Sequence, residues 1–229
     1  MTTFVLIHGA YQGGWIWQPV AARLRAAGHT VYTPTLDGCA ERRHALRPGI
    51  NTETHGAEIA ELLFFEDLKD VVLVGTSSGG MVMARAAELA REHVGRVVFA
   101  DALALMNGEK IRDIVMQPAA INTDMALGPS KEDAAGRLFA SLEPQLRAWA
   151  VERVTLHPSA CYTSPVKLES FWRQSWQASV LYCSQAPNPG EAHIRRCADA
   201  LKARWHVIDT GHYPMLSTPD ALTKFIVET

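Results

Sequence analysis

Residues 71–90, VVLVGTSSGGMVMARAAELA, constrain the fold more than any other stretch of the chain. Four apolar residues run into Gly-Thr-Ser-Ser-Gly-Gly, and an alanine-rich helical pattern follows at once. A strand that passes so abruptly into a helix is typical of a βα unit whose strand lies inside a parallel sheet. The stretch therefore predicts an α/β protein.

The same unit repeats along the chain. Short apolar runs lie at 4–7, 30–33, 71–74, 97–100, 179–183 and 206–208, and helical patterns lie at 19–27, 53–65, 81–91, 191–203 and 220–227. These runs are nearly continuous rather than alternating, as expected of strands that are buried on both faces. We expect one domain over residues 1–229, with a mostly parallel central sheet and helices on both faces.

The strand–helix repeat is interrupted between about residue 104 and residue 176. This stretch contains five prolines, shows helical pieces such as 131–142, and has neither a strand–helix repeat nor a Gly/Ser linker. We interpret it as a helical cap inserted between two parts of the core, residues 1–103 and 177–229. The cap is expected to lie over the sheet.

Composition argues against several classes of protein. The net charge of -2 and the lack of a basic stretch interleaved with aromatics argue against a nucleic-acid partner. No positive region precedes the short apolar run MTTFVLIHGA, and no apolar run approaches the roughly 18 residues of a membrane span. The four cysteines, Cys39, Cys161, Cys183 and Cys197, show no CxxC pairing, so neither zinc nor a disulfide framework is predicted. We expect a cytoplasmic protein without a membrane partner, metal or organic cofactor.

Ser77 is the candidate nucleophile. It is central in G-x-S-x-G at 75–79, and the strand-to-helix context is the one that this motif requires. The N–H of Ser78 can point at an oxyanion, and the N–H of Ala10, after the first strand, is the candidate second donor. His8 is expected to be structural. The alternative is a glycine-rich turn that binds phosphate or merely turns, although the spacing matches neither the Walker nor the dinucleotide pattern.

His212 is the candidate base, because it follows the last strand in 205-WHVIDTGHYPMLSTP-219. An early serine and a late histidine match the chain order of a known hydrolase arrangement. The acid is harder to place, since the loop after 179–183 contains no carboxylate before Glu191.

Asp101 is the preferred acid. It directly follows four apolar strand residues, where an unpaired carboxylate is costly. Asp101 could instead cap the next turn. Asp209 is expected to shape its own loop, and Glu109 and Asp113 remain alternatives within the cap.

Three segments together resemble the α/β-hydrolase superfamily: 4-FVLIHGAYQGGWIW-17, 71-VVLVGTSSGGMV-82 and 209-DTGHYPMLSTP-219. More narrowly, they resemble the branch of plant methyl esterases and hydroxynitrile lyases, and above all small bacterial esterases of the carbendazim-hydrolysing type. Those bacterial relatives lack the later aspartate, which fits Asp101. The lyases carry threonine in place of Gly9 and lysine in place of Tyr213, and family members usually have histidine in place of Thr76.

The resemblance and the motifs together predict a serine esterase. Ser77, His212 and Asp101 would cleave a small carboxylic or carbamic ester through an acyl-enzyme intermediate. Four aromatic residues are expected to bind the substrate: Tyr11, Trp149, Trp176 and Tyr213. The alternatives are a hydroxynitrile lyase or an amidase on the same residues, or a non-catalytic small-molecule receptor. The resemblance also implies a possible homodimer.

Overall fold

The computed structural model describes residues 1–115 and 119–228. Within these residues, six parallel strands form the central sheet in the order β2-β1-β3-β4-β8-β9. The strands are β1 (Thr3–Ile7), β2 (Thr30–Tyr32), β3 (Val71–Ser77), β4 (Val94–Ala102), β8 (Gln177–Cys183) and β9 (Arg204–Ile208). The expected α/β fold with a parallel sheet is confirmed, and each predicted strand is present.

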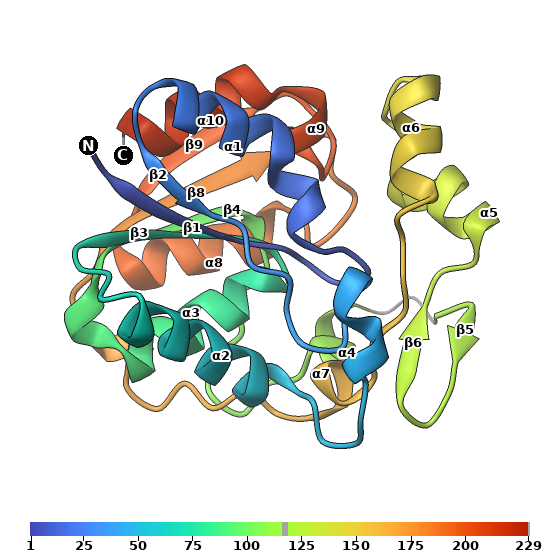
Figure 1. The fold of residues 1–229 in the computed structure, drawn as a ribbon, viewed down its shortest axis with the longest axis horizontal. Helices are drawn as coiled ribbons and strands as arrows, with labels where there is room; N and C mark the ends of the chain where they lie inside the picture. Colours follow the sequence, from blue (N-terminus) through green and yellow to red (C-terminus); the bar gives the residue numbers. More distant parts are fainter. Residues whose placement is uncertain (116–118, 229) are drawn as a thin grey trace.

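Helices cover both faces of the sheet because its central strands are apolar on both sides. In β3, Val71 and Leu73 belong to one apolar cluster, and Val72 and Val74 belong to the other. The first cluster includes residues of α2 (Thr52–Phe65), α3 (Gly79–Leu89) and α8 (Glu191–Leu201). The second includes residues of α1 (Gln18–Ala26) and α10 (Pro219–Glu228). Figure 1 shows α1 and α10 on one side of the sheet and α2 and α3 on the other.

Short elements join these units. The 3-10 turns η1 (Gly14–Trp17), η2 (Ala40–Ala45) and η3 (Arg91–His93) lie in the core, and α9 (Pro214–Ser217) follows β9. The chain between β4 and β8, residues 103–176, is called the inserted segment below.

The inserted segment is more varied than the helical cap that was predicted. Its helices are α4 (Ile111–Ile114), α5 (Lys131–Asp133), η4 (Ala134–Leu138), α6 (Pro144–Val151), α7 (Ala160–Thr163) and η5 (Phe171–Arg173). It also carries an antiparallel sheet of β5 (Ile121–Asn122), β6 (Ala126–Gly128) and β7 (His157–Pro158). The predicted helical piece at 131–142 is α5 followed by the π-helical turn η4. Strands this short carry no readable alternation, which is why periodicity did not predict them.

Only part of the inserted segment stands apart from the sheet. In Figure 1, α5, α6, β5 and β6 lie beyond the ends to which the sheet strands point. The two ends of the segment, through Leu105, Ile111, Val166 and Phe171, pack into the core cluster beside α3 instead. The boundary between cap and core therefore runs inside the inserted segment.

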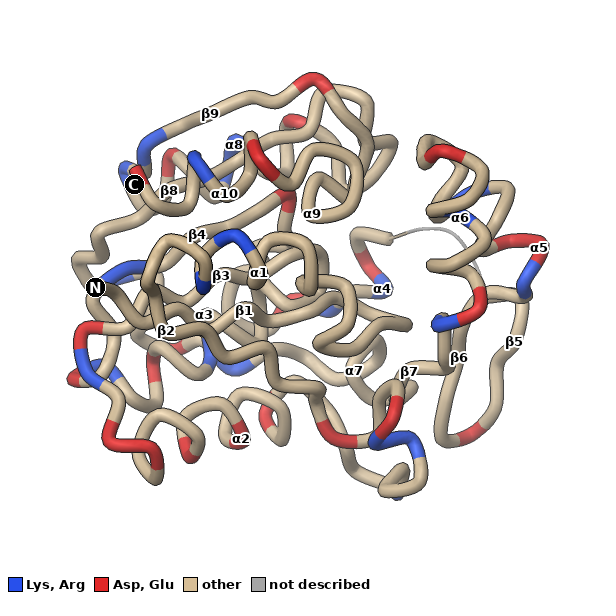
Figure 2. The backbone as a smooth tube through the Cα atoms, turned by 45° about the horizontal axis from the view of Figure 1, so that its top comes forward, with Lys and Arg blue, Asp and Glu red and all other residues tan. Residues whose placement is uncertain are grey.

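Charge is spread over the molecule. Figure 2 shows acidic and basic residues interspersed over the sheet core and the inserted segment, in keeping with the net charge of -2. In the described part of the chain, no helix combines the length and the apolar character that a membrane crossing requires.

Candidate active site

Ser77 lies where β3 ends and α3 is about to begin. Its φ of 50° is in the left-handed region, a strained conformation for a residue with a side chain. Only glycines fit around this turn. A Cβ added at Gly75 would lie 2.7 Å from the Gly79 carbonyl oxygen, and one added at Gly79 would lie 2.5 Å from the His8 carbonyl oxygen. The sequence thus forces the strand and helix together and holds the serine at the tip of the turn.

Asp101 occupies a bulge near the end of β4. The pairing of β3 with β4 steps from Ala100 to Ala102, which leaves Asp101 without a partner on β3. Its φ of 48° is also left-handed. Because a bulge re-aims the side chain of its extra residue, the carboxylate leaves the regular alternation of the strand.

The bulge directs Asp101 toward His212, which lies in the loop between β9 and α9. Asp101 Oδ2 lies 2.6 Å from His212 Nδ1, and its Oδ1 accepts a hydrogen bond from the N–H of Cys183 at 3.0 Å. The Asp101 side chain is 0% exposed. Both oxygens of this buried carboxylate are therefore satisfied, and one of them orients the imidazole.

Two of the alternative acids have other partners. Asp209 accepts hydrogen bonds from the side chains of Ser184 and Gln185 at 2.6 and 3.1 Å, so it shapes its loop as expected. Glu109 pairs with the Arg196 guanidinium at 2.8 Å. Asp113 lies on α4.

Ser77 and His212 line the same pocket. Among the described residues, no hydrogen bond joins Ser77 Oγ to the imidazole. Such contacts are often long without substrate and shorten in the Michaelis complex.

Ala10 and Ser78 line the same pocket as Ser77. Within the described chain, neither N–H donates to another backbone or side-chain group, which leaves both available for a substrate oxygen. Gln12, a residue that the sequence did not single out, steadies this loop because its buried side chain accepts the N–H of Gly9 at 3.3 Å.

His8 is buried beneath the same loop. Its Nδ1 lies 2.7 Å from the Gly9 carbonyl oxygen, and its Nε2 accepts the N–H of Leu36 at 3.0 Å. Burial lowers the pKa of His8 to about 4, so the ring is neutral. A neutral histidine with both nitrogens engaged serves the backbone, as the sequence predicted.

Two of the four predicted substrate-binding aromatics line the pocket, namely Tyr11 and Tyr213. The Tyr11 hydroxyl accepts a hydrogen bond from Tyr162 at 2.8 Å, which leaves its own hydrogen free to donate. Burial raises the pKa of Tyr11, and burial raises that of Tyr213 as well, so both phenols are neutral.

The prediction is corrected for Trp149 and Trp176, which lie outside this pocket. Trp176 is 9% exposed and stacks on Phe171 in the core. The guanidinium carbon of Arg91 lies over the Trp176 ring, 4.2 Å from its centroid. Trp149 packs edge-on against Trp15. Position inside the inserted segment did not reveal which aromatics face the core.

The pocket also contains residues that sequence reasoning missed. It has a volume of about 260 Å³. Arg137, on η4, brings a cation to its wall, and Leu103 and Leu138 make part of the wall apolar. Leu103 directly follows β4. No local pattern marks Arg137 and Leu138, because they reach the pocket only through the way the inserted segment folds back.

Comparison with known proteins agrees with this geometry. The sequence profile of the alpha/beta hydrolase family matches residues 4–225. A carbendazim hydrolyzing esterase from Nocardioides sp. (strain SG-4G) is 36% identical over 240 residues, covering 98% of each chain. An alpha-hydroxynitrile lyase from Arabidopsis thaliana is 31% identical over 100 residues, which are 43% of this chain and 39% of the lyase.

Solved structures show the same fold at low sequence identity. An extracellular alpha/beta-hydrolase from a Paenibacillus species superposes with a TM-score of 0.88 at 21% identity, covering 100% of this chain and 98% of that one. The methylesterase MES16 from Arabidopsis superposes with a TM-score of 0.82 at 17% identity, again covering 100% and 98%. The resemblance to esterases of this branch is confirmed, and the chain belongs to the alpha/beta hydrolase family.

Proposed function

We propose that the protein is a serine esterase that cleaves a small carboxylic or carbamic ester through an acyl-enzyme intermediate. The observation that carries this proposal is the Asp101–His212 pair at 2.6 Å, directed at a pocket that the strained Ser77 also lines. A buried carboxylate, an imidazole and a hydroxyl that lines a pocket are the parts that activate a serine.

The first step forms the acyl-enzyme. With Nδ1–H donated to Asp101, His212 Nε2 carries the lone pair and takes the proton of Ser77 Oγ. The oxygen of Ser77 attacks the ester carbonyl, and the N–H groups of Ala10 and Ser78 hold the resulting oxyanion. Removing one such donor typically costs about 10²–10³ in rate.

The second half of the reaction reverses these roles. The His212 imidazolium gives its proton to the departing alcohol as the C–O bond breaks. Water then adds to the acyl group, losing its proton to His212, and the acid leaves as Ser77 Oγ regains that proton. The negative charge of Asp101 stabilises the imidazolium throughout.

The pocket and the relatives support an ester of modest size. A volume of about 260 Å³ lies just below the usual range for drug-sized ligands. The 36% identical relative is named a carbendazim hydrolyzing esterase, and several shorter matches are named methylesterases. We infer a compact acyl group beside Leu103 and Leu138, with the Tyr11 hydroxyl donating to a substrate oxygen.

Labelling with a fluorophosphonate probe tests the proposal. The folded wild-type protein is expected to be labelled at Ser77, and Ser77→Ala to be unlabelled. Ser78→Ala is the matched control, since it keeps the backbone N–H and should keep labelling. A folded wild type that resists the probe would favour the non-catalytic receptor instead, and labelling of Ser77→Ala would place the nucleophile elsewhere.

A second candidate, hydroxynitrile lyase activity, is favoured by one observation. Tyr213 stands where the lyases carry a lysine, but Arg137 lines the pocket from η4 and offers a cation for departing cyanide. Cyanide release from mandelonitrile, together with failure to cleave p-nitrophenyl butyrate, would identify a lyase. The opposite pattern would identify the esterase.

A further inference from the structure

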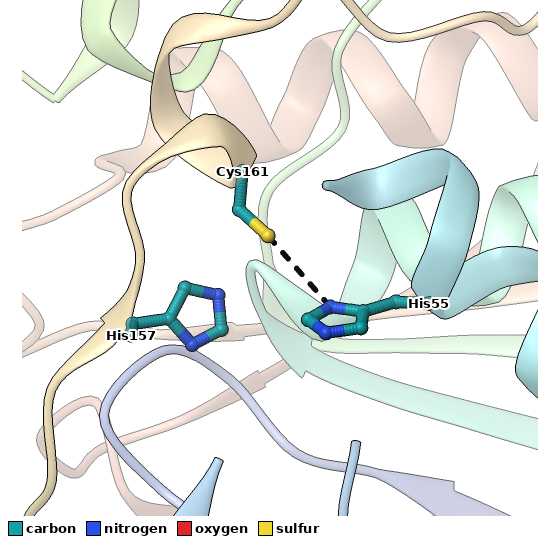
Figure 3. Close-up of side chains that lie close together, drawn as sticks. All are labelled: His55, His157 and Cys161. Carbon is teal, nitrogen blue, oxygen red and sulfur yellow. Dashed lines mark hydrogen bonds between the residues drawn. The ribbon is translucent and has the colours of Figure 1, made fainter. Parts of the chain in front are cut away.

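A buried group of two imidazoles and a thiol lies outside the active-site pocket, between α2 and the inserted segment. His55 comes from α2, His157 from β7 and Cys161 from α7, and all three are buried. One ligand atom from each of them lies within 4.8 Å of the others. Figure 3 shows the two rings and the thiol turned toward a common space.

Each histidine uses one ring nitrogen for a contact outside this common space, which leaves its other ring nitrogen to face the space. The Nε2 of His55 lies 2.9 Å from the carbonyl oxygen of Asp37, to which it donates, so Nδ1 carries the lone pair. That Nδ1 is 3.7 Å from Cys161 Sγ. Carbonyl partners of this kind fix the tautomer and orientation of histidines that bind metals.

His157 is held in a similar way. Its Nδ1 contacts Cys39 Sγ at 3.4 Å, and Cys39 in turn lies 3.8 Å from the Asp37 carbonyl oxygen. Nε2 is the nitrogen left for the shared space.

We propose that His55, His157 and Cys161 form a binding site for a thiophilic divalent cation, with Zn²⁺ the best fit. Imidazole nitrogen and thiolate sulfur are the ligands that zinc prefers, and the lack of a carboxylate in the group disfavours magnesium or calcium. Three protein ligands leave one position of a tetrahedral ion for water. On binding, the Cys161 thiol releases its proton to solvent as the sulfur–metal bond forms.

The site would fasten the inserted segment to the core beside the pocket. Cys161 is adjacent to Tyr162, whose hydroxyl bonds the pocket residue Tyr11. Both tyrosine rings also meet His157 edge-on, with centroids 6.2 and 6.1 Å away. A cation that fixed His157 and Cys161 against α2 would therefore hold this wall of the pocket in place.

Cysteine spacing in the sequence predicted no zinc site. Spacing along the chain does not detect a group of ligands that comes together only in the fold. The three ligands come from separate elements, and only His157 and Cys161 are close along the chain. The grouping arises when β7 and α7 pack on the start of α2. There the Asn51–Thr54 capping box fixes the first turn, which contains His55.

The test uses the full-length chain without a histidine tag, refolded with and without Co²⁺ or Zn²⁺. We expect stoichiometric metal by elemental analysis and thiolate-to-cobalt charge-transfer absorption in the near ultraviolet. The Tm should rise by about 5–10 °C at a hundredfold excess of free metal over Kd. Cys161→Ala should lose the charge-transfer band, whereas the matched variant Cys197→Ala, also a buried cysteine, should keep it.

Three results would overturn the site. They are a refolded wild type that retains no metal, a charge-transfer band that survives in Cys161→Ala, and an equal loss of the band in Cys197→Ala. If Cys161→Ala does not fold, His55→Gln replaces it, and unchanged metal content and spectra in that variant would refute the assignment. None of these readouts depends on ester cleavage, so the result stands apart from the proposed esterase activity.

Discussion

Replacing Asp101 by asparagine tests the proposed triad with the least disturbance of the fold. Asparagine has the same shape, and its Oδ1 can still accept the N–H of Cys183, which now bonds Asp101 at 3.0 Å. Its amide nitrogen, however, would face His212 Nδ1 in place of the carboxylate oxygen at 2.6 Å. Because an amide N–H donates, it stabilises the tautomer that carries its proton on Nε2, and that nitrogen can no longer accept the proton of Ser77.

The expected loss follows from this change of tautomer. The same exchange in serine proteases lowers kcat by about 10⁴, which corresponds to about 5.4 kcal/mol of transition-state stabilisation. We expect a similar fall in kcat/KM for p-nitrophenyl butyrate, with Ser77→Ala as the blank. Since both hydrogen bonds can be replaced, the free energy of unfolding should change by no more than about 1 kcal/mol.

Near-normal activity in a folded Asp101→Asn protein would refute this reasoning. It would mean that the observed pair positions the loop without supplying charge. The acid would then be sought at Asp113, or the enzyme would operate with Ser77 and His212 alone. Loss of activity with loss of the native circular dichroism would not count as support, so the unfolding curve of each variant is measured beside its rate.

Four further changes have distinct outcomes. Gly9→Ala would place a Cβ 2.6 Å from Ser77 Cβ, so kcat should fall about ten- to a hundredfold, whereas Gly136→Ala, which meets open space, should leave kcat unchanged. Trp176→Ala should lower the free energy of unfolding in urea by about 3–5 kcal/mol without changing kcat/KM of the folded fraction, and a selective loss of substrate affinity would contradict the core placement. Arg137→Met should lower kcat/KM for p-nitrophenyl hemisuccinate relative to the butyrate about three- to fivefold, and an equal effect from Arg173→Met, outside the pocket, would show that the effect is not local. The pKa of His8 is about 4 in the folded protein, against an ordinary value of 6.5, so the unfolded chain binds the proton first and the free energy of unfolding decreases as pH falls from 6.5 toward 4. Between pH 7.5 and 5, wild type should lose about 2 kcal/mol more of this free energy than His8→Asn. Parallel pH profiles for the two proteins would disprove this.

The sheet and the tight turn at Ser77 were predictable because their sequence signals are local. Each strand is a short apolar run, and Gly75 and Gly79 flank Ser77 in a turn where a side chain on either glycine would strike backbone. His212 was selected by its place after the last strand and by chain order, and it lies in the pocket beside Asp101. Asp101 was reached by elimination, but the bulge that directs its side chain was not, since nothing in the sequence distinguishes a bulged residue from a paired one.

The inserted segment resisted prediction for a physical reason. Its strands span two or three residues, and its helices span three to eight, so no periodic pattern extends far enough to be read. Whether an aromatic there faces the pocket or the core depends on long-range packing. Trp176 stacks on Phe171 in the core, while Tyr162 reaches the pocket.

The division between the sheet core and the inserted segment also separates the proposed catalytic residues from residues that shape the pocket wall. Ser77 and Asp101 are fixed by the ends of β3 and β4, where tight turns and buried hydrogen bonds leave little freedom. Arg137 and Tyr162 come from the inserted segment, so the segment can change the pocket wall without moving the proposed reacting groups. A metal ion at His55, His157 and Cys161 would act on this second part, because its ligands join α2 to the wall and none of them contacts the proposed triad. We therefore expect removal of the metal to raise KM for p-nitrophenyl butyrate more than it lowers kcat, and a fall in kcat alone would show that the two parts are not separate.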